Sequence, residues 1–405
     1  MRLLLFAAKL GYQIRVFEEA ARRLGIDVQL VTDRCHILDD PWGDHALAVR
    51  FDDPLASLEA ITGSYDGIVA VADRPLYLAA LAAQKLGVAF HSPLSIQTSQ
   101  NKHQAREAFR ATGLLVPTFR RLPISASPTG EDETYPCVLK PLALSGSRGV
   151  IRANNPVEFR AAWHRIAKLL NSGEIRERRD EADGFIQIET YIPGREFAIE
   201  GLLTKGRLRV LAIFDKPDPL EGPFFEETVY VTPSRESVEV QARIVEAMEL
   251  AVAAVELSDG PLHGECRVND AGVWVLEVAG RPIGGLCAKA LSFNGGQPLE
   301  ELVLRHALGE EFDAQLDGPA SGVMMIPVPG AGVLERVKGV DEARQVPGIT
   351  EVIITAKESE RLVPLPEGNS YPGFIFARAD SPSSVELSLH KAHTLIQFQL
   401  LTILK

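Results

Sequence analysis

The stretch LHGECRVNDAGVWVLEVAGRPIGG, residues 262–285, contains two apolar alternating runs separated by a short polar turn that ends in glycine. This alternation is typical of two β-strands joined in a hairpin. Glu265 and Glu277 lie inside these runs, twelve residues apart, although carboxylates are disfavoured in strands. Their presence therefore needs a reason other than strand propensity.

A three-residue turn would bring the two glutamates together. If the turn spans 270–272, with its glycine in the left-handed conformation that such loops favour, Asn269 pairs with Val273. Glu265 then lies directly opposite Glu277, and two facing carboxylates repel each other unless a cation lies between them. Mg²⁺ fits this position because it is usually held by one or two carboxylates and by phosphates, and Mn²⁺ is the alternative. The other interpretation is a sheet whose polar face meets water.

The composition limits the classes of partner. At 405 residues, with 46% hydrophobic and 24% charged residues, the chain is long enough for two or three folded domains. Its net charge of −12 argues against nucleic acid or an anionic membrane as the main partner, because both attract basic surfaces. No run approaches the roughly 18 apolar residues of a membrane span, and the N-terminal apolar run of about six residues is short for a signal peptide.

The cysteines point to a reducing compartment. The four cysteines are widely spread and form no C-x-x-C motif: Cys35, Cys137, Cys266 and Cys287. This usage favours the cytoplasm.

The first ninety residues alternate between strand and helix patterns. Strands are expected over 2–8, 27–33 and 65–73, and helices over 12–25 and 75–87. Such alternation predicts an open α/β sheet, whose ligand crevice lies at the carboxyl ends of the strands. No G-x-G-x-x-G follows the first strand, so a nicotinamide-dependent oxidoreductase is not expected.

The middle of the chain mixes helices with further strands. We expect one helix from about residue 95 that ends at Gly113, and a strand that ends at Lys140 before a Ser/Gly loop. These are followed by a helix over 155–170, a solvated connection over 172–184, consecutive antiparallel strands over 184–214, and a helix over 237–256. After about residue 310, short strands and a helix capped near Ser381 predict a smaller α+β domain.

Three motifs identify a family resemblance. VLKPLALSGSRGV (138–150), IETYIPGREFAIEG (188–201) and the stretch from residue 263 to 285 occur in the order and at the spacing of ATP-grasp enzymes. The resemblance covers about residues 1–310 and is strongest to carboxylate–amine ligases of the L-amino acid ligase type, whose architecture is similar to that of biotin carboxylase. It implies a Rossmann-like pre-ATP-grasp domain (1–98), an ATP-grasp domain (99–309, with a lid over about 114–197) and a C-terminal α+β domain (310–405).

The resemblance also implies the nucleotide site. Lys102 and Lys140 would contact the phosphates of ATP, and Lys140 is expected to face solvent when no nucleotide is bound. The β- and γ-phosphates would be covered by the loop Ser145, Gly146, Ser147, Arg148 and Gly149. The backbone from Glu189 through Tyr191 to Ile192 would hold the adenine edge, and Glu196 would hold the ribose hydroxyls. The alternatives are a plain turn for the loop and ordinary surface strand residues for Glu189 and Glu196.

The implied catalytic residues surround the two metal ligands, Glu265 and Glu277. Arg281 would stabilise negative charge on the reacting phosphate, and its alternative role is a salt bridge to Glu277. His263 is either a substrate contact or a structural residue. Many relatives carry Asn where this chain has Ala279, so a third metal ligand is missing at that position.

The implied activity is an ATP- and Mg²⁺-dependent ligase. It would convert a small-molecule carboxylate into an acyl phosphate, release ADP and join the acyl group to an amine, with an amino acid or a peptide-like molecule as substrate. Two alternatives remain, a bicarbonate-activating carboxylase of the biotin carboxylase or purine-biosynthesis type and a non-catalytic ATP-binding scaffold. Relatives of this architecture are often dimers, which makes a homodimer the expected assembly.

Overall fold

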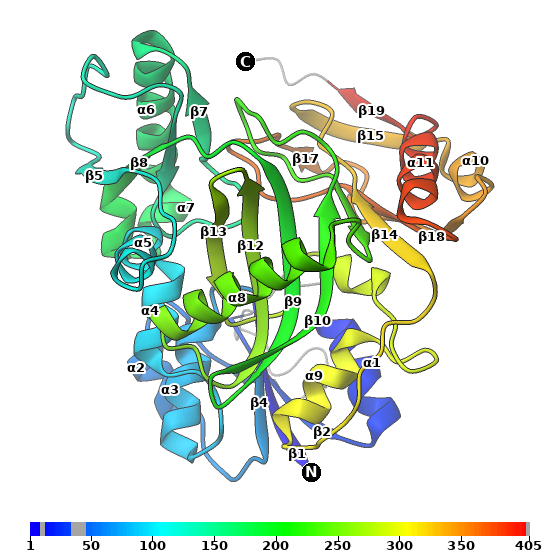
Figure 1. Ribbon diagram of the computed structural model, residues 1–405. Helices are drawn as coiled ribbons and strands as arrows, with labels where there is room; N and C mark the ends of the chain where they lie inside the picture. Colours follow the sequence, from blue (N-terminus) through cyan, green and yellow to red (C-terminus); the bar gives the residue numbers. More distant parts are fainter. Residues whose placement is uncertain (9–12, 34–45, 402–405) are drawn as a thin grey trace.

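The N-terminal part of the computed structural model is a parallel sheet between helices (Figure 1). The structure describes residues 1–8, 13–33 and 46–401, so Cys35 lies outside the described part. The elements are β1 (Arg2–Ala7), α1 (Gln13–Leu24), β2 (Asp27–Thr32), β3 (Leu47–Ala48), α2 (Pro54–Glu59), β4 (Gly67–Val71) and α3 (Leu76–Leu86). The strand order is β3-β2-β1-β4, and β1 runs parallel to both β2 and β4. The predicted α/β arrangement is confirmed.

Strand β1 is apolar from Leu3 to Ala7 because both of its faces are covered. Leu3 and Leu5 pack into the hydrophobic cluster that contains Phe17 of α1, whereas Leu4 and Phe6 pack into the cluster that contains the alanines of α3. All four strand residues are fully buried. A continuous apolar run is what a strand covered on both faces requires.

The prediction of a single helix from about residue 95 to Gly113 is wrong, because the chain breaks the helix at Asn101. Helix α4 (Pro93–Gln100) ends there, and α5 (Lys102–Ala111) begins directly afterwards. Asn101 has extended backbone angles, and its side chain accepts hydrogen bonds from the N–H groups of His103 and Gln104 at 3.1 and 3.2 Å. This N-cap makes Lys102 the first residue of α5. The backbone N–H of Lys102 donates to Leu142 O at 2.9 Å, which ties the break to the Ser/Gly loop.

A second sheet and its helices occupy the range predicted to be the lid, and this part is called the lid below. Its elements are β5 (Phe119–Pro123), β6 (Cys137–Pro141), β7 (Ile151–Ala153), α6 (Pro156–Leu170), α7 (Gly173–Arg176), η1 (Glu181–Gly184) and β8 (Phe185–Thr190). The strand order of this lid sheet is β5-β8-β6-β7, and α6 packs Phe159, Trp163 and Ile166 against it. The connection over 172–184, predicted as solvated loop, contains the short helices α7 and η1.

The third sheet is the largest and continues to the C-terminal part of the chain. Its strands are β9 (Arg195–Thr204), β10 (Arg207–Lys216), β11 (Val229–Thr232), β12 (Gly260–Asn269), β13 (Gly272–Ala279), β14 (Ala320–Met325), β16 (Ile349–Ile354) and β18 (Gly373–Ala379). The order is β13-β12-β9-β10-β11-β14-β18-β16. Helix α8 (Val238–Ala254) crosses its face in front of β9 and β12 (Figure 1). Strands from both sides of residue 310 therefore belong to one continuous sheet. The domain boundary expected at residue 310 stays a prediction.

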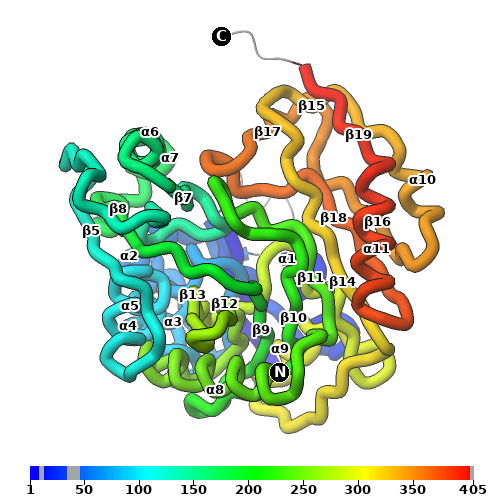
Figure 2. Tube along the Cα trace, turned by 45° about the horizontal axis from the view of Figure 1, so that its top comes forward, coloured from blue at the N-terminus to red at the C-terminus, as the bar shows by residue number. Residues whose placement is uncertain are grey.

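Two short elements follow the hairpin of β12 and β13, namely η2 (Cys287–Ala290) and α9 (Leu299–Ala307), and α9 packs against α1 and β4 of the N-terminal part. The C-terminal part, which lies across from the lid in Figure 2, adds β15 (Gly332–Lys338), α10 (Val340–Arg344), β17 (Arg361–Leu362), α11 (Pro382–His393) and β19 (Gln397–Leu401). The predicted cap at Ser381 is confirmed, since its side chain accepts from Ser384 N–H at 3.2 Å. Among the described helices, none is both long enough and apolar enough to cross a bilayer.

The run of antiparallel strands predicted over 184–214 is divided between two sheets. Strand β8 belongs to the lid sheet, whereas β9 and β10 pair with each other in the large sheet. The PGR segment is therefore a crossover and not a hairpin turn. Gly194 within it has φ +131, and a Cβ atom there would collide with the carbonyl oxygen of Val268. Glycine thus allows the chain to pass closely over β12.

The hairpin of β12 and β13 has a different turn from the predicted one but places the glutamates as predicted. Asn269 pairs with Gly272, so the turn has two residues. A β-bulge at Leu276 then adds one residue to β13. The bulge shifts the register back by one, and Glu265 lies opposite Glu277.

Candidate active site

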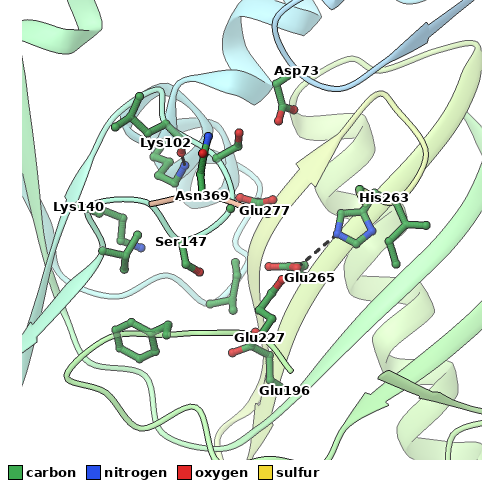
Figure 3. A pocket seen from close by; sticks show the side chains of 18 of the residues that line it. Asp73, Lys102, Lys140, Ser147, Glu196, Glu227, His263, Glu265, Glu277 and Asn369 are labelled. Atoms are coloured by element: carbon green, nitrogen blue, oxygen red, sulfur yellow. Dashed lines mark hydrogen bonds and ion pairs between the residues drawn. The ribbon is translucent and has the colours of Figure 1, made fainter. Parts of the chain in front are cut away.

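A cleft of about 350 Å³ lies between the lid, the large sheet and the N-terminal part (Figure 3). The structure brings most of the predicted site residues into its wall: Lys102, Lys140, Ser145, Gly146, Ser147, Glu189, Tyr191, Ile192, Glu196, His263, Glu265, Glu277 and Arg281. These residues come from segments separated by up to 179 positions in the chain, from Lys102 to Arg281. Arg148 and Gly149 do not line the cleft.

Arg148 and Gly149 instead fix the loop by contacts with residues outside the cleft. The guanidinium of Arg148 donates two hydrogen bonds of 2.9 Å to Glu174 and one of 2.8 Å to the carbonyl oxygen of Glu367. The N–H of Gly149 donates to Pro366 O at 2.8 Å. A Cβ atom on Gly149 would lie 2.7 Å from Pro141, so glycine is required by packing as well as by φ +75.

The two predicted phosphate lysines already have partners within the protein. Lys102 Nζ donates to Leu144 O at 2.6 Å. Lys140 Nζ lies 2.5 Å from Glu189 Oε2, and its side chain is only 12% exposed. The expectation that Lys140 faces solvent is therefore wrong, because Glu189 on the adjacent strand β8 draws the ammonium to the cleft wall. Burial lowers the pKa of Lys140 to about 8.

Glu189 is the centre of a buried ion-pair network. Arg106 Nε donates to its other oxygen at 2.9 Å, and Gln187 Nε2 donates at 2.8 Å. Burial alone would raise the pKa of Glu189, but Arg106 and Lys140 hold it at about 2. Arg106 also donates to the carbonyl oxygens of Val275 and Leu276 at 3.1 and 2.8 Å. One arginine thus joins the lid strand to the bulge of the hairpin.

Lys216, which the sequence interpretation missed, lies among three carboxylates. Its Nζ is 2.9 Å from Glu196, 2.5 Å from Glu227 and 2.8 Å from Glu265, and its side chain is 1% exposed. Burial opposes the charge, yet the three glutamates raise the pKa of Lys216 well above its ordinary value. A lysine at the end of the apolar run VLAIFDK is the signal that could have identified it, since Lys140 ends a similar run.

Glu227 and Arg267 complete this cluster. Burial and the neighbouring Glu265 carboxylate raise the pKa of Glu227 above its ordinary range. Arg267 donates to Glu196 Oε2 at 2.7 Å and to the carbonyl oxygen of Ile192 at 2.7 Å. Both oxygens of Glu196 are therefore engaged by cations, although the residue still lines the cleft.

The facing glutamates form a donor set suited to a hard divalent ion. Ligand atoms of His263, Glu265 and Glu277 all lie within 4.8 Å of one another, and those of Glu196, Glu227 and Glu265 do so as well. Carboxylate oxygens suit Mg²⁺, which binds at roughly 2.1 Å. Glu265 and Glu277 therefore fit the ion that the sequence predicts, whereas the ammonium group of Lys216 already lies among the three carboxylates of the second group.

His263 acts as a hydrogen-bond donor in this arrangement. Its Nδ1 lies 2.5 Å from Glu200 Oε1, and its Nε2 lies 3.3 Å from Glu265 Oε1. Burial lowers the pKa of His263, but Glu200 and Glu265 outweigh it and raise the pKa to about 10. A protonated imidazole has no free lone pair for a metal ion. The geometry supports a role for His263 in orienting Glu265.

Arg281 pairs with Asp73 and not with Glu277. The guanidinium binds the Asp73 carboxylate at 2.7 and 3.2 Å, from the N-terminal sheet across to the end of β13. Burial favours the neutral acid, but Arg281 lowers the pKa of Asp73 below its ordinary value. Asp73 was not predicted, although it follows β4 at the carboxyl edge where the crevice was expected.

Comparisons with known proteins add the family relations. Residues 133–290 match the family described as "ATP-grasp domain", and residues 324–400 match "L-amino acid ligase C-terminal domain 2". The structure is similar to the crystal structure of an L-amino acid ligase from Bacillus licheniformis, with 26% identity, a TM-score of 0.83 and coverage of 99% of each chain.

Two curated sequences show the range of similarity. The uncharacterized protein y4rH of Sinorhizobium fredii is 22% identical over 390 residues, which cover 93% of this chain and 79% of that protein. The alanine–anticapsin ligase of Bacillus subtilis is 25% identical over 203 residues, which cover 47% of this chain and 42% of that ligase.

Proposed function

The chain is an ATP-grasp ligase of the ADP-forming carboxylate–amine type, and we propose that it activates the carboxylate of an amino acid or a peptide-like molecule and joins it to an amine. The observation that carries the proposal is the pairing of Glu265 with Glu277 in a cleft that also contains Lys102 and Lys140. Paired carboxylates beside lysines are suited to the transfer of a phosphoryl group.

The adenine and the phosphates of ATP have matching donors in the cleft. Within the described residues, Ile192 N–H has no acceptor, whereas Thr190 and Tyr191 donate to Thr118 O and Pro136 O. The N–H groups of Gly146 and Ser147 are also without an acceptor in the described part of the chain, and both residues have positive φ. Such successive N–H groups form a concave anion site.

The metal ligands and Arg281 are suited to the reacting end of the nucleotide. Glu265 and Glu277 would hold Mg²⁺, which supplies Lewis-acid stabilisation of the phosphates. Arg281 keeps its planar, permanently charged group at the end of β13, oriented by Asp73. Developing negative charge on the transferred phosphoryl group would meet this guanidinium.

The proposed reaction has two steps. A carboxylate oxygen of the first substrate attacks the γ-phosphorus, the bond to the β-γ bridging oxygen breaks, and ADP leaves. The amine nitrogen of the second substrate then attacks the acyl carbon, inorganic phosphate leaves, and the nitrogen loses a proton. Both steps need positioning and neutralisation of charge, which this cleft offers, and no nucleophilic side chain.

The product assay distinguishes this proposal from its alternatives. Purified protein with ATP and Mg²⁺ is expected to release ADP and phosphate only when a carboxylate and an amine are both present. Amino acids supplied singly and in pairs, followed by phosphate release and mass spectrometry of the ligated product, provide the test. Formation of AMP and pyrophosphate would contradict the mechanism. Bicarbonate-dependent release with a carboxylated product would favour the carboxylase, and ATP binding without turnover would favour the scaffold.

The substitution Lys140→Ala is expected to weaken binding of a non-hydrolysable ATP analogue by about 10- to 100-fold, the range of one hydrogen bond to a charged group. The fold should remain, because Glu189 keeps Arg106 and Gln187 as partners. Isothermal titration and a thermal melt measure the two effects. The matched control is Lys338→Ala, at an exposed site on β15. Equal affinity of Lys140→Ala and wild type would remove Lys140 from the nucleotide site.

A further inference from the structure

The segment over 363–372, between β17 and β18, reaches from the C-terminal part of the chain to the loop over 145–149, named the phosphate loop here. Pro366 O accepts from Gly149 N–H, and Glu367 O accepts from Arg148 Nε, both at 2.8 Å. The Glu367 carboxylate also binds Arg165 of α6 at 2.5 and 2.8 Å. This segment, named the C-terminal loop here, is therefore fixed to both the phosphate loop and the lid.

The C-terminal loop makes a tight turn that is anchored on its other side as well. Gly368 N–H donates to Pro364 O at 3.0 Å, and a Cβ atom on Gly368 would collide with Val363 O. The carbonyl oxygen of Tyr371 accepts from Thr355 Oγ1 at 2.8 Å. Asn369, between these two anchors, has a defined place in the fold although its side chain is exposed.

Asn369 lines the cleft together with Lys102 and Glu277. Figure 3 shows its side chain entering the same cavity as these two residues. No other described residue forms a hydrogen bond with the Asn369 amide, which offers two N–H donors and a carbonyl acceptor. Ala279, by contrast, contributes no polar side-chain atom near the metal ligands.

The charge balance of the cleft shows what such a donor can do. Among the described residues that line it, each cation is already engaged: Lys102 with a carbonyl oxygen, Lys140 with Glu189, His263 with Glu200, Arg267 with Glu196, and Arg281 with Asp73. A bound triphosphate adds several negative charges beside Glu265 and Glu277. Neutral N–H donors that are not committed to protein acceptors can bind its oxygens without first breaking an ion pair.

We propose that Asn369 binds the terminal phosphate of bound ATP through its amide N–H group, so that the C-terminal domain supplies a residue of the phosphoryl-transfer site. This inference rests on the proposed use of ATP. It assigns the C-terminal loop a direct part in the site: the contacts of Pro366 and Glu367 align the phosphate loop, and Asn369 meets the γ-phosphate from the side of Lys102 and Glu277.

The test compares two nucleotides in the presence of Mg²⁺, a non-hydrolysable ATP analogue and ADP, by isothermal titration of the full chain. Asn369→Ala is expected to lower the affinity for the ATP analogue about tenfold, because it removes one hydrogen bond to a charged group. The affinity for ADP should be unchanged. Asn369→Asp should lower the affinity for the ATP analogue further, because a carboxylate repels the phosphate. The matched control, Ser370→Ala, changes the adjacent exposed residue, which does not line the cleft, and should bind both nucleotides as wild type does.

The outcomes separate this inference from the proposed function. If wild type binds the analogue and Asn369→Ala binds it equally well, the role of Asn369 is disproved while ATP use stands. An equal loss for the analogue and ADP would also overturn it, because a γ-phosphate contact cannot affect ADP. If wild type binds neither nucleotide, the proposed function itself fails.

Discussion

Replacing Glu277 with glutamine is expected to lower turnover about 1000-fold while weakening binding of the ATP analogue less than about tenfold. Loss of one preorganised charge contact at a reacting group costs about 100- to 1000-fold in rate, and here the lost carboxylate would hold the ion that stabilises the γ-phosphate. Glutamine keeps the size of the side chain, so the hairpin register should persist. Steady-state phosphate release and titration with the analogue measure the two effects.

The control for Glu277→Gln is Glu335→Gln, an exposed position on β15 outside the cleft. It should leave both measurements at the wild-type value. A Glu277→Gln protein that turns over within tenfold of wild type would show that the facing glutamates do not hold a catalytic ion. Titration of Mn²⁺ in the absence of nucleotide provides a second readout, and the variant should bind it more weakly.

The substitution Lys216→Met is expected to lower the free energy of unfolding by about 3–5 kcal/mol at neutral pH, the range seen when one partner of a buried ion pair is removed. Methionine keeps the length of the side chain, but it leaves Glu196, Glu227 and Glu265 close together without their ammonium group. Denaturant unfolding measures the loss. The control is Lys289→Met, which removes a half-exposed lysine that forms an ion pair with Glu351 and should cost no more than about 1 kcal/mol.

The stability deficit of Lys216→Met should depend on pH and on divalent ions. Without the ammonium group, mutual repulsion and burial raise the pKa values of the three folded-state carboxylates above those of the unfolded chain. The folded variant then binds more protons, so its deficit should shrink as the pH falls from 8 towards 5. Mg²⁺ should stabilise the variant more than wild type, because an ion can occupy the space among the carboxylates. A deficit that is independent of both pH and Mg²⁺ would contradict this account of the cluster.

Local patterns in the sequence predicted much of the fold, and the ATP-grasp resemblance is confirmed. The hairpin is the clearest case, because alternation specified two strands and their facing carboxylates. The turn length was wrong, and the bulge at Leu276 compensated for it. The alternation of residues in the sequence cannot distinguish a longer turn from a shorter turn followed by a bulge, because each of these shifts the strand register by one residue. Only the strand pairing in three dimensions decides between them.

Asp73 was missed, and Arg148 was assigned to the cleft, because the partners of these two residues are distant in the chain. Asp73 meets Arg281 across 208 positions, and Arg148 meets the carbonyl oxygen of Glu367 across 219. No local periodicity reports such pairings. The break at Asn101 was detectable in principle, because Asn is a strong N-cap residue, but the helical pattern on both sides concealed it. Lys140 was misplaced for a related reason, since the charge that draws it inward comes from another strand.

The position of the C-terminal loop has a consequence for synthesis on the ribosome. Domains generally fold as they emerge from the ribosome, with the N-terminal part first. The sheet of β1 to β4 is complete once the chain has been translated as far as Val71. The large sheet cannot close in that order, because β18 lies between β14 and β16 and is translated after both. The loop that precedes β18 brings Pro366 and Glu367 to the phosphate loop, which is itself translated more than 200 residues earlier. A nascent chain that already has its lid therefore still lacks one wall of the cleft, and nucleotide affinity should arise only in the last stage of translation.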